Sequence, residues 1–437
     1  MEVDLIIQAR WIIPVEPDSV TYENHSLVVD NGKIIDLLPS SLVEQKYQAA
    51  SIEDLPQHVL MPGLINSHTH TSMTLLRGIA DDLPLMDWLQ NHIWPLEQKW
   101  MSESFVRDGT DLAIAEMIRG GTTCFNDMYF FPEVTAHQAI QYGMRANIGL
   151  IVVDFPSVWA DNAEAYIEKG LALHDEHRHE HLITTSFAPH APYTVSDQPL
   201  STIRTFADEL ELQIHMHVHE TQHEVEEPEQ RPLQRLHQLG LLSPSFMAVH
   251  MTQMTDDEIT LMAETGAHII HCPESNLKLA SGFCPVAQCI AAGINVALGT
   301  DGAASNNDLD MFGEMRTAAL LAKGVSGDAS AVPAMTAIKM ATINGAKALG
   351  LEDKIGSLEI GKLADIIAID MDHLETQPLY DPVSQIVYAT SRQQVTDVWV
   401  AGKQLLRQRK LTTININELK NKVSEWQNKL SNVDKIK

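Results

Sequence analysis

Eight short apolar segments divide the middle of this chain, and their spacing limits the folds that it can adopt. The candidate strands are residues 59–67, 122–128, 145–153, 182–189, 213–219, 246–251, 267–272 and 295–300. Helical patterns such as SESFVRDGTDLAIAEMIRGG and SDQPLSTIRTFADELE lie between them. Strands that alternate with helices are typical of parallel sheets, and eight such units close into a barrel. We therefore predict an α/β protein in which residues 59–358 form a (β/α)₈ TIM-like barrel.

The two ends of the chain resemble each other and differ from the middle. Near the N-terminus, DLIIQARWIIPV and SLVVDNGKIIDLLP have strand patterns, and Asn31-Gly32 between apolar runs is a hairpin signal. Near the C-terminus, LADIIAIDM (363–371), QIVYAT (385–390) and TDVWVAGKQLL (396–406) have the same character, and INELKNKVSEWQNKL predicts a terminal helix. We predict that residues 1–58 and 359–437 together build a small β-sandwich domain.

Charge and composition restrict the partners. The chain has 30 basic and 58 acidic residues and a net charge of −28, which opposes binding to nucleic acid and to anionic membranes. The first residues, MEVDLIIQARWIIPVE, have a strand pattern rather than that of a signal peptide, and no run of 18 apolar residues occurs. The four cysteines include no CxxC pair, as expected for reduced, buried thiols. We expect a cytoplasmic protein with a small-molecule partner.

Histidines and acidic residues lie at the carboxyl ends of the predicted strands, where barrel enzymes place their chemistry. In the stretch INSHTHTSM, His68 and His70 are two residues apart, so both imidazoles point to one side of a strand. The other strand-end residues are His190, His215, His217, His219, Glu220, His250, His271, Glu274 and Asp301. Burying so many polar groups without partners would be costly. Imidazole and carboxylate ligands suit Zn²⁺, Fe²⁺ or Mn²⁺, and an open position would let the metal activate water.

Residues 219–223, HETQH, also match the HExxH signature of zinc peptidases. That signature requires a helix, whereas the preceding IHMHVH alternates between apolar residues and histidine as a strand does. A peptidase site would also leave His68, His70 and Asp301 without a role. The sequence therefore favours the strand and keeps the peptidase as a weaker alternative.

The order of these residues resembles the amidohydrolase superfamily: HxH after strand 1, HxxE at strand 5, His at strand 6 and Asp at strand 8. Within it, the chain is similar nearly end to end to the 5-methylthioadenosine/S-adenosylhomocysteine deaminases. The similar segments are GLINSHTHTSMTLLRGIADDLPLMDWL, GTTCFNDMY, APHAPYTVS, HVHET, HCPESNLKLASG and GTDGAASNNDLDMF. The HxH and TD elements mark the superfamily only, and their combination with PHAPY, HCPESN and GTDGAASNN is more specific.

The resemblance implies a site in residue-level detail. It implies one divalent metal per chain, Zn with Fe or Mn as alternatives, bound by His68, His70, His217 and Asp301. The implied catalytic residues are Glu220 as proton shuttle, His250, which orients the attacking water, and Asp301, which also accepts a proton. The implied substrate-binding residues are Trp88, Glu97, Arg145, His190, Glu220 and Ser305. A homo-oligomer, dimer or tetramer, is also implied.

The implied reaction is hydrolytic deamination of 5′-methylthioadenosine, and of S-adenosylhomocysteine and adenosine, to the inosine derivative and ammonia. Water attacks C6 more easily if N1 is protonated, and Glu220 can carry the proton. One departure bears on the substrate. Relatives with good activity on the homocysteine compound tend to have a second arginine shortly after strand 3, and residues 151–170 contain none. We therefore expect methylthioadenosine, which lacks that carboxylate, to be the better substrate.

Other functions remain open. One alternative is an amidohydrolase-superfamily deaminase or dechlorinase of another ring, such as guanine, a pterin or an s-triazine. A second is a non-catalytic scaffold, although this chain keeps the four implied ligands together with Glu220 and His250. Zinc deaminases with a PCxxC site are excluded, because the sequence has no such motif.

Overall fold

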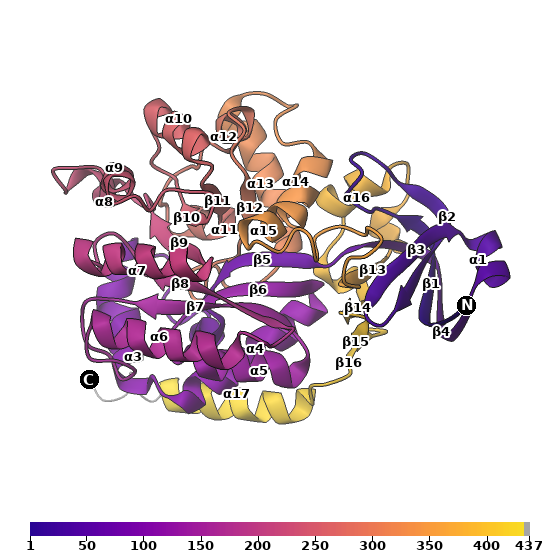
Figure 1. The fold of residues 1–437 in the computed structure, drawn as a ribbon, viewed down its shortest axis with the longest axis horizontal. Coiled ribbons are helices and arrows are strands. Elements are labelled where there is room, and N and C mark those ends of the chain that lie inside the picture. Colours follow the sequence, from indigo (N-terminus) through magenta and orange to yellow (C-terminus); the bar gives the residue numbers. More distant parts are fainter. Residues whose placement is uncertain (432–437) are drawn as a thin grey trace. The chain divides into compact units, whose positions relative to one another are not determined.

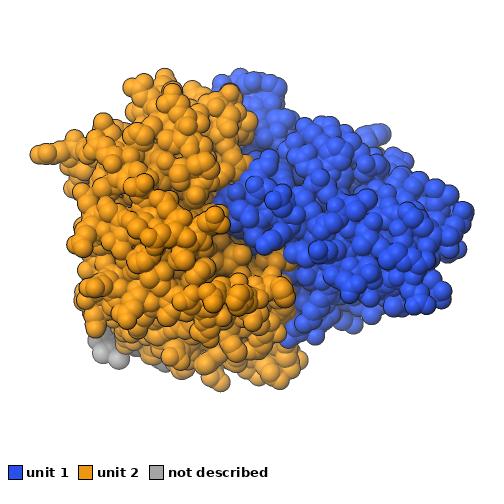
Figure 2. Space-filling view, in the orientation of Figure 1, with its two compact units in different colours: residues 1–66, 117–124, 310–413 blue, residues 67–116, 125–309, 414–437 orange. Residues whose placement is uncertain are grey.

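The computed structural model describes residues 1–431 and divides the chain into two compact units (Figure 2). Unit 1 comprises residues 1–66, 117–124 and 310–413, and unit 2 comprises residues 67–116, 125–309 and the chain from Ile414. The boundaries of these units differ from those of the predicted domains. Residues 310–358, predicted as part of the barrel domain, belong to unit 1, and the C-terminal helix, predicted with the terminal strands, belongs to unit 2. Within residues 1–431, no helix has the length and apolar character that crossing a membrane requires.

The barrel sheet has the eight predicted strands (Figure 1). They are β5 (Leu64–Thr69), β6 (Thr122–Met128), β7 (Arg145–Val152), β8 (Ile183–Pro189), β9 (Gln213–Val218), β10 (Phe246–His250), β11 (His268–His271) and β12 (Val296–Leu298). Hydrogen bonds join them in the order β12-β11-β10-β9-β8-β7-β6-β5, so each strand neighbours the next in sequence. The Asp301 N–H donates to the His68 carbonyl at 3.0 Å, which brings the chain after β12 back to β5. The predicted (β/α)₈ barrel is confirmed.

These segments form strands because both of their faces are covered. Every residue of β5, β6 and β7 is buried, as in sheets that helices cover on both sides. The helices between them include α4 (Glu103–Arg119), α5 (Pro132–Tyr142), α6 (Ala163–His177), α7 (Asp197–Leu210) and α10 (Asp256–Thr265). Side chains start two of these helices: Asn162 caps α6, and Thr255 with Glu258 forms a capping box at α10. The loops that precede the helices therefore have defined ends.

A second sheet combines strands from both ends of the chain. Its order is β16-β15-β14-β13-β4-β1-β2-β3, with β1 (Glu2–Ile12), β2 (Tyr22–Asp30), β3 (Lys33–Pro39), β4 (Gln48–Pro62), β13 (Ile366–Asp370), β14 (Val395–Val400), β15 (Lys403–Arg407) and β16 (Lys410–Leu411). Antiparallel pairing of β4 with β13 joins the two halves. Asn31 and Gly32 have φ of 48° and 72°, which suits the tight turn between β2 and β3. The predicted pairing of strands from both termini is confirmed, in one mixed hydrogen-bonded sheet, and the domain limits at residues 58 and 359 stay a prediction.

One predicted strand was wrong. Residues 385–390, QIVYAT, belong largely to a helix, α16 (Pro382–Tyr388), rather than to a strand. The Asp381 side chain accepts a hydrogen bond from the Val383 N–H, and Pro382 occupies the first turn, so a proper helix start outweighs the β-branched composition. The predicted C-terminal helix is confirmed as α17 (Ile416–Ser431).

Gly299 occupies the place where the end of β12 approaches β5. A Cβ atom at this position would lie 2.8 Å from both the backbone nitrogen and the Cβ of His68. Rotation of a side chain cannot relieve this contact, because one of the partners is backbone. Only glycine therefore lets the last strand approach the first without displacing His68.

We expect Gly299→Ala to destabilise the protein by about 1–3 kcal/mol, because a methyl group would be forced into a packed site. Denaturant unfolding of the purified protein measures this change. Gly324→Ala is the control. Gly324 lies in α13 (Met311–Ser326), and a Cβ atom there would meet no described atom within 4 Å outside its own helix backbone. Alanine is also the better helix former. An unchanged unfolding midpoint for Gly299→Ala would contradict the role assigned to this glycine.

Candidate active site and metal centre

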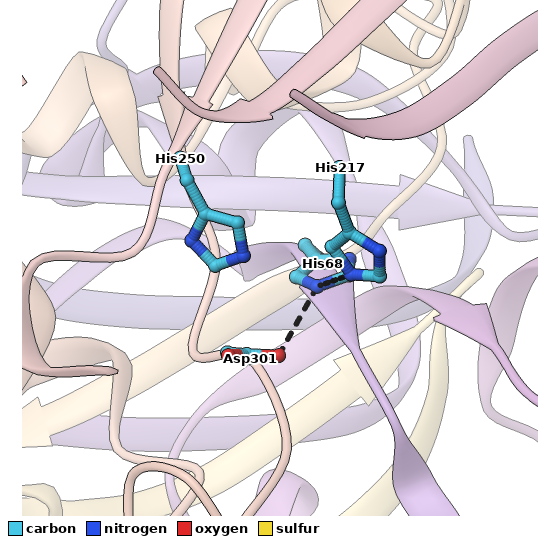
Figure 3. Close-up of side chains that lie close together, drawn as sticks. All are labelled: His68, His217, His250 and Asp301. Atoms are coloured by element: carbon cyan, nitrogen blue, oxygen red, sulfur yellow. Dashed lines mark hydrogen bonds and ion pairs between the residues drawn. The ribbon is translucent and has the colours of Figure 1, made fainter. Parts of the chain in front are cut away.

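Four side chains from separate strands meet at one end of the barrel (Figure 3). His68 comes from β5, His217 from β9, His250 from the end of β10, and Asp301 follows β12. One ligand atom from each of the four lies within 4.8 Å of the others, and all four side chains are buried. Figure 3 shows the rings of His217 and His250 on one side and the Asp301 carboxylate on the other. Three imidazoles and a carboxylate are a donor set for a divalent metal.

His70 belongs to the same cluster. Its Nε2 lies 3.1 Å from Asp301 Oδ1, and His68 Nε2 lies 3.2 Å from the same oxygen. His217 Nε2 lies 3.1 Å from His68 Nε2. Donor atoms bound tetrahedrally to one zinc ion are about 3.3 Å apart, since each bond is about 2.0–2.1 Å long. The spacing therefore fits a metal held by the four predicted ligands, His68, His70, His217 and Asp301, with His250 beside it.

Backbone carbonyls fix the orientation of two of these imidazoles. The Nδ1 of His217 lies 2.8 Å from the His190 carbonyl, and the Nδ1 of His70 lies 2.5 Å from the Met128 carbonyl. A carbonyl can only accept, so each Nδ1 carries the hydrogen. In the neutral ring each Nε2 then presents its lone pair, which is the tautomer that a metal ligand requires.

Side chains hold the other two ligands. His68 Nδ1 lies 2.9 Å from Nε2 of His215, which lies two residues before His217 on the same strand. Asp301 Oδ2 accepts hydrogen bonds from the Ser275 and Ser305 hydroxyls at 2.7 and 2.8 Å. Its other oxygen, Oδ1, is left to face the imidazoles. Ser275 was missed in the sequence, although it lies in the quoted motif HCPESN, because a serine beside a predicted glutamate gives no distinct signal.

The buried Asp301 carboxylate sets the electrostatics of this cluster. Burial works to raise the pKa of Asp301, but the hydrogen bonds and charges of His68 and His70 hold it well below its usual range. Burial lowers the pKa of His68 to about 4. At His70 burial also opposes the charge, yet the hydrogen bond and charge of Asp301 raise the pKa to about 9. The negative charge of the buried Asp301 carboxylate raises the pKa of His70, and the same charge favours binding of a divalent cation.

Glu220 and His250 form the second part of the site. Glu220 lies two residues beyond the end of β9 and is 7% exposed. Its Oε2 lies 3.8 Å from His250 Nε2, and burial raises the pKa of its carboxyl group. His250 Nδ1 lies 2.9 Å from the Asn276 side-chain oxygen, so Nδ1 carries a hydrogen and Nε2 faces Glu220. A carboxylate with a raised pKa beside a metal-binding cluster is typical of a proton-transfer group.

The cluster lies at the base of a cavity in unit 2. Of the predicted substrate-binding residues, Trp88, Glu97, His190, Glu220 and Ser305 line this cavity. Trp88 ends α2 (Leu85–Trp88), and Glu97 lies on α3 (Trp94–Trp100). A π-helical turn, Leu89–Ile93, connects these two helices, and such turns are frequent at functional sites. The rest of the wall is largely apolar: Met73, Leu85, Leu89, Ile93, Trp94, Met128, Phe130, Ile151, Val153, Phe155 and Leu279.

Two of the polar residues in the cavity have partners that set their hydrogen-bonding state. The Tyr129 hydroxyl donates to Glu97 Oε1 at 2.6 Å, and burial raises the pKa of Glu97. Burial lowers the pKa of His190 to about 3, and its Nδ1 lies 3.0 Å from the Thr194 hydroxyl. His190 is therefore a neutral imidazole. Tyr129 was missed, although the quoted motif FNDMY ends on it.

Arg145 does not reach the cavity, so its predicted substrate contact is not supported. It is the first residue of β7, its side chain is buried, and its Nη1 donates to the His181 carbonyl at 3.1 Å. Ile151, near the other end of the same strand, lines the cavity. Six residues of strand span about 20 Å, so an arginine at the amino end faces away from the chemistry.

The HETQH segment is not a zinc-peptidase site. β9 ends at Val218, and His219 accepts a hydrogen bond at Nε2 from the Leu233 N–H at 3.2 Å. The His223 side chain is 58% exposed and lies 3.3 Å from Glu227. The two histidines therefore face different surroundings and do not converge on one ion.

A parallel eight-stranded barrel with histidines and one aspartate at its strand ends is the arrangement of a metal-dependent hydrolase. Residues 59–405 match the model of the amidohydrolase family. The 5-methylthioadenosine/S-adenosylhomocysteine deaminases of Teredinibacter turnerae and Saccharophagus degradans are 53% and 52% identical to the chain, covering 98% of it and 98% and 97% of their own lengths. The chain belongs to the amidohydrolase family and, within it, to the family of these deaminases.

A solved structure agrees with these relatives. The crystal structure of an adenosine deaminase from Xanthomonas campestris with bound zinc matches with a TM-score of 0.97 and 50% identity. The match covers 99% of each chain. The fold is therefore shared with a protein whose crystal structure contains bound zinc.

We expect His68→Ala to lose bound metal, because it removes a donor that lies within about 3.2 Å of two others. Atomic absorption on protein dialysed after purification gives the metal content per chain. His223→Ala is the matched control, since this histidine is exposed and outside the cluster, and it should retain metal. The assignment fails if the control loses metal while His68→Ala keeps it.

Proposed function

We propose that the protein is a metal-dependent hydrolytic deaminase that converts the 6-amino group of 5′-methylthioadenosine to the inosine derivative and ammonia. The observation that supports this most is the position of Glu220, buried 3.8 Å from His250 on the edge of the ligand cluster. We propose Zn²⁺ as the metal, because nitrogen and oxygen donors at this spacing suit it and the Xanthomonas campestris protein binds it.

The proposed mechanism divides the proton transfers among the residues of the chain. A divalent metal in the cluster supplies positive charge that brings the pKa of the attacking water toward neutrality. Glu220 accepts a proton from this water and donates it to N1 of the adenine ring, which makes C6 electrophilic. The oxygen adds to C6, His250 orients it through Nε2, and Asp301 accepts its remaining proton. Asp301 passes this proton to the amino group as the C6–N bond breaks, so that the nitrogen leaves as neutral ammonia.

The cavity offers contacts for the remainder of a nucleoside. We propose that Trp88 packs near the base and that the half-buried Glu97 carboxylate accepts hydrogen bonds from the ribose hydroxyls, with its orientation set by Tyr129. The neutral His190 supplies a further polar contact. The Ser305 hydroxyl donates its hydrogen to Asp301, so this hydrogen is not available for a hydrogen bond to the substrate.

The cavity favours an uncharged 5′ substituent. Among residues 1–431, those that line it include no lysine or arginine. Arg235 lines a neighbouring cavity, but its nitrogens Nε, Nη1 and Nη2 donate to Asp197 Oδ1, the Pro192 carbonyl and the Val195 carbonyl. A carboxylate on the 5′ substituent would therefore enter a largely apolar surrounding without a lysine or arginine to pair with it.

We expect kcat/KM for methylthioadenosine to exceed that for S-adenosylhomocysteine at least about tenfold, since an unpaired charge costs more than about 1.4 kcal/mol. Loss of adenine absorbance measures both reactions and that of adenosine. Equal efficiency on the two thioethers, or a preference for the homocysteine compound, would contradict this expectation. Ammonia release from guanine, a pterin or an s-triazine, but not from methylthioadenosine, would favour another ring substrate.

Glu220→Gln should keep its metal and lose turnover, because the amide preserves the shape of the side chain but cannot take up a proton. We expect kcat to fall about 10²–10⁴-fold, the usual contribution of a general acid–base group. The absorbance assay and a metal determination on the same sample test this together. Turnover close to that of the unaltered protein would remove Glu220 from the mechanism.

The pH profile should show an acidic limb. Glu220 acts as a base only when ionised, and burial raises its pKa, so kcat/KM should fall as the pH drops through that value. The midpoint of this limb should lie above about 4.3, the pKa of an exposed glutamate. Initial rates at subsaturating methylthioadenosine across the pH range locate it. If kcat/KM stays constant as the pH falls to about 4.3, the pKa of an exposed glutamate, Glu220 is not the base.

A further inference from the structure

A second glutamate, outside the ligand cluster, holds the backbone of the proton-transfer residue. Glu224 lies on the short helix α8 (Gln222–Glu226), and its side chain turns back toward the end of β9. Its Oε1 accepts a hydrogen bond from the His219 N–H at 2.8 Å, and its Oε2 accepts one from the Glu220 N–H at 2.7 Å. The residue is buried, and hydrogen bonds to a carboxylate are about twice as strong as neutral ones.

Thr252 holds the same turn on its carbonyl side. Its backbone N–H donates to the His219 carbonyl at 3.0 Å, and its hydroxyl donates to the Glu220 carbonyl at 2.7 Å. The two N–H groups and two carbonyls of residues 219 and 220 thus all have partners. Of these partners, Glu224 is the only side chain that binds both N–H groups.

The turn needs such support because its backbone is unusual. His219 has φ of 54°, in the left-handed region that residues other than glycine seldom adopt. A non-glycine residue in such a conformation costs of order 1–3 kcal/mol and persists only where its surroundings enforce it. The turn at His219 ends the strand and directs Glu220 into the cavity beside His250.

We propose that Glu224 is a positioning residue for Glu220: its carboxylate fixes the turn so that the Glu220 side chain stays within reach of the reacting atoms. The proposal rests on the proton-transfer role proposed for Glu220. Glu224 itself lines the neighbouring cavity and not the one that holds the ligand cluster. Its effect is therefore transmitted through the backbone of residues 219 and 220. A misplacement of about 1 Å at a reacting group can cost about 100-fold in rate.

The test is the Glu224→Gln variant of the full-length, metal-loaded protein. Glutamine keeps the size of the side chain but turns an NH₂ group toward one of the two N–H donors. We expect kcat on methylthioadenosine to fall at least about tenfold with KM within about twofold and metal content unchanged. Glu224→Asp, which keeps both oxygens, should recover part of the rate. Glu226→Gln is the matched control, because Glu226 is exposed on the same helix, and it should be unchanged.

A double variant separates positioning from a general structural effect. If Glu224 acts through Glu220, adding Glu224→Gln to Glu220→Gln should not slow the residual reaction further, since the two changes remove one function. The proposal is overturned if Glu224→Gln lowers kcat in the Glu220→Gln protein by the same factor as in the unaltered protein. It is also overturned if the kcat of the single Glu224→Gln variant stays within twofold of the unaltered protein. Loss of metal in parallel with activity would also overturn it.

The outcomes distinguish this proposal from the proposed function. Inactive Glu220→Gln together with fully active Glu224→Gln overturns the positioning role alone. Fully active Glu220→Gln overturns the proposed mechanism and the positioning role with it. If Glu224→Gln does not fold, Glu224→Asp decides: a lower kcat at unchanged KM and metal content supports the role, and unaltered kinetics overturn it.

Discussion

The contact of Asp301 with His68 of β5 and with His70 just after that strand is the interaction on which the rest of the site depends. One carboxylate oxygen lies 3.2 Å from His68 and 3.1 Å from His70, and its charge is buried. A buried carboxylate is tolerable only with hydrogen bonds and positive charge around it. Ser275 and Ser305 supply the hydrogen bonds on one oxygen, and the imidazole cluster offers a place for a cation on the other.

The surrounding structure follows from that requirement. Gly299 lets the end of β12 lie against β5, and the Asp301 N–H binds the His68 carbonyl at the same place. Each ligand also makes a hydrogen bond to a residue that is not itself a ligand. These bonds fix the ligand side chains, so the donor atoms keep their spacing before any metal binds. The proton-transfer residue has the same kind of support, supplied by a carboxylate and a threonine on the turn that follows β9.

Much of the barrel and of the ligand cluster was predictable, because the sequence pattern of an apolar segment followed by a polar residue is local and recurs along the chain. Eight apolar segments fixed the strands, and polar residues at the ends of those segments fixed which side chains meet. Arg145 lies at the amino end of β7, away from the strand ends that carry the cluster, and its predicted substrate contact stays a prediction. Ser275 and Glu224 could not be found, since their roles depend on atoms that only the folded chain brings within reach. The helix at 382–388 shows that an Asp-Pro start outweighs β-branched composition.

The chain distance between the ligands has a consequence for the order of folding. His68 and Asp301 are 233 residues apart in sequence, with every other barrel strand between them. Contacts of such long range form late, because a large loop must close before they are made. A chain still in synthesis can present His68, His70 and even His217, but it has no carboxylate to complete the set. Metal loading is therefore coupled to the closing of the barrel, and bound metal stabilises the closed form over any partly folded one.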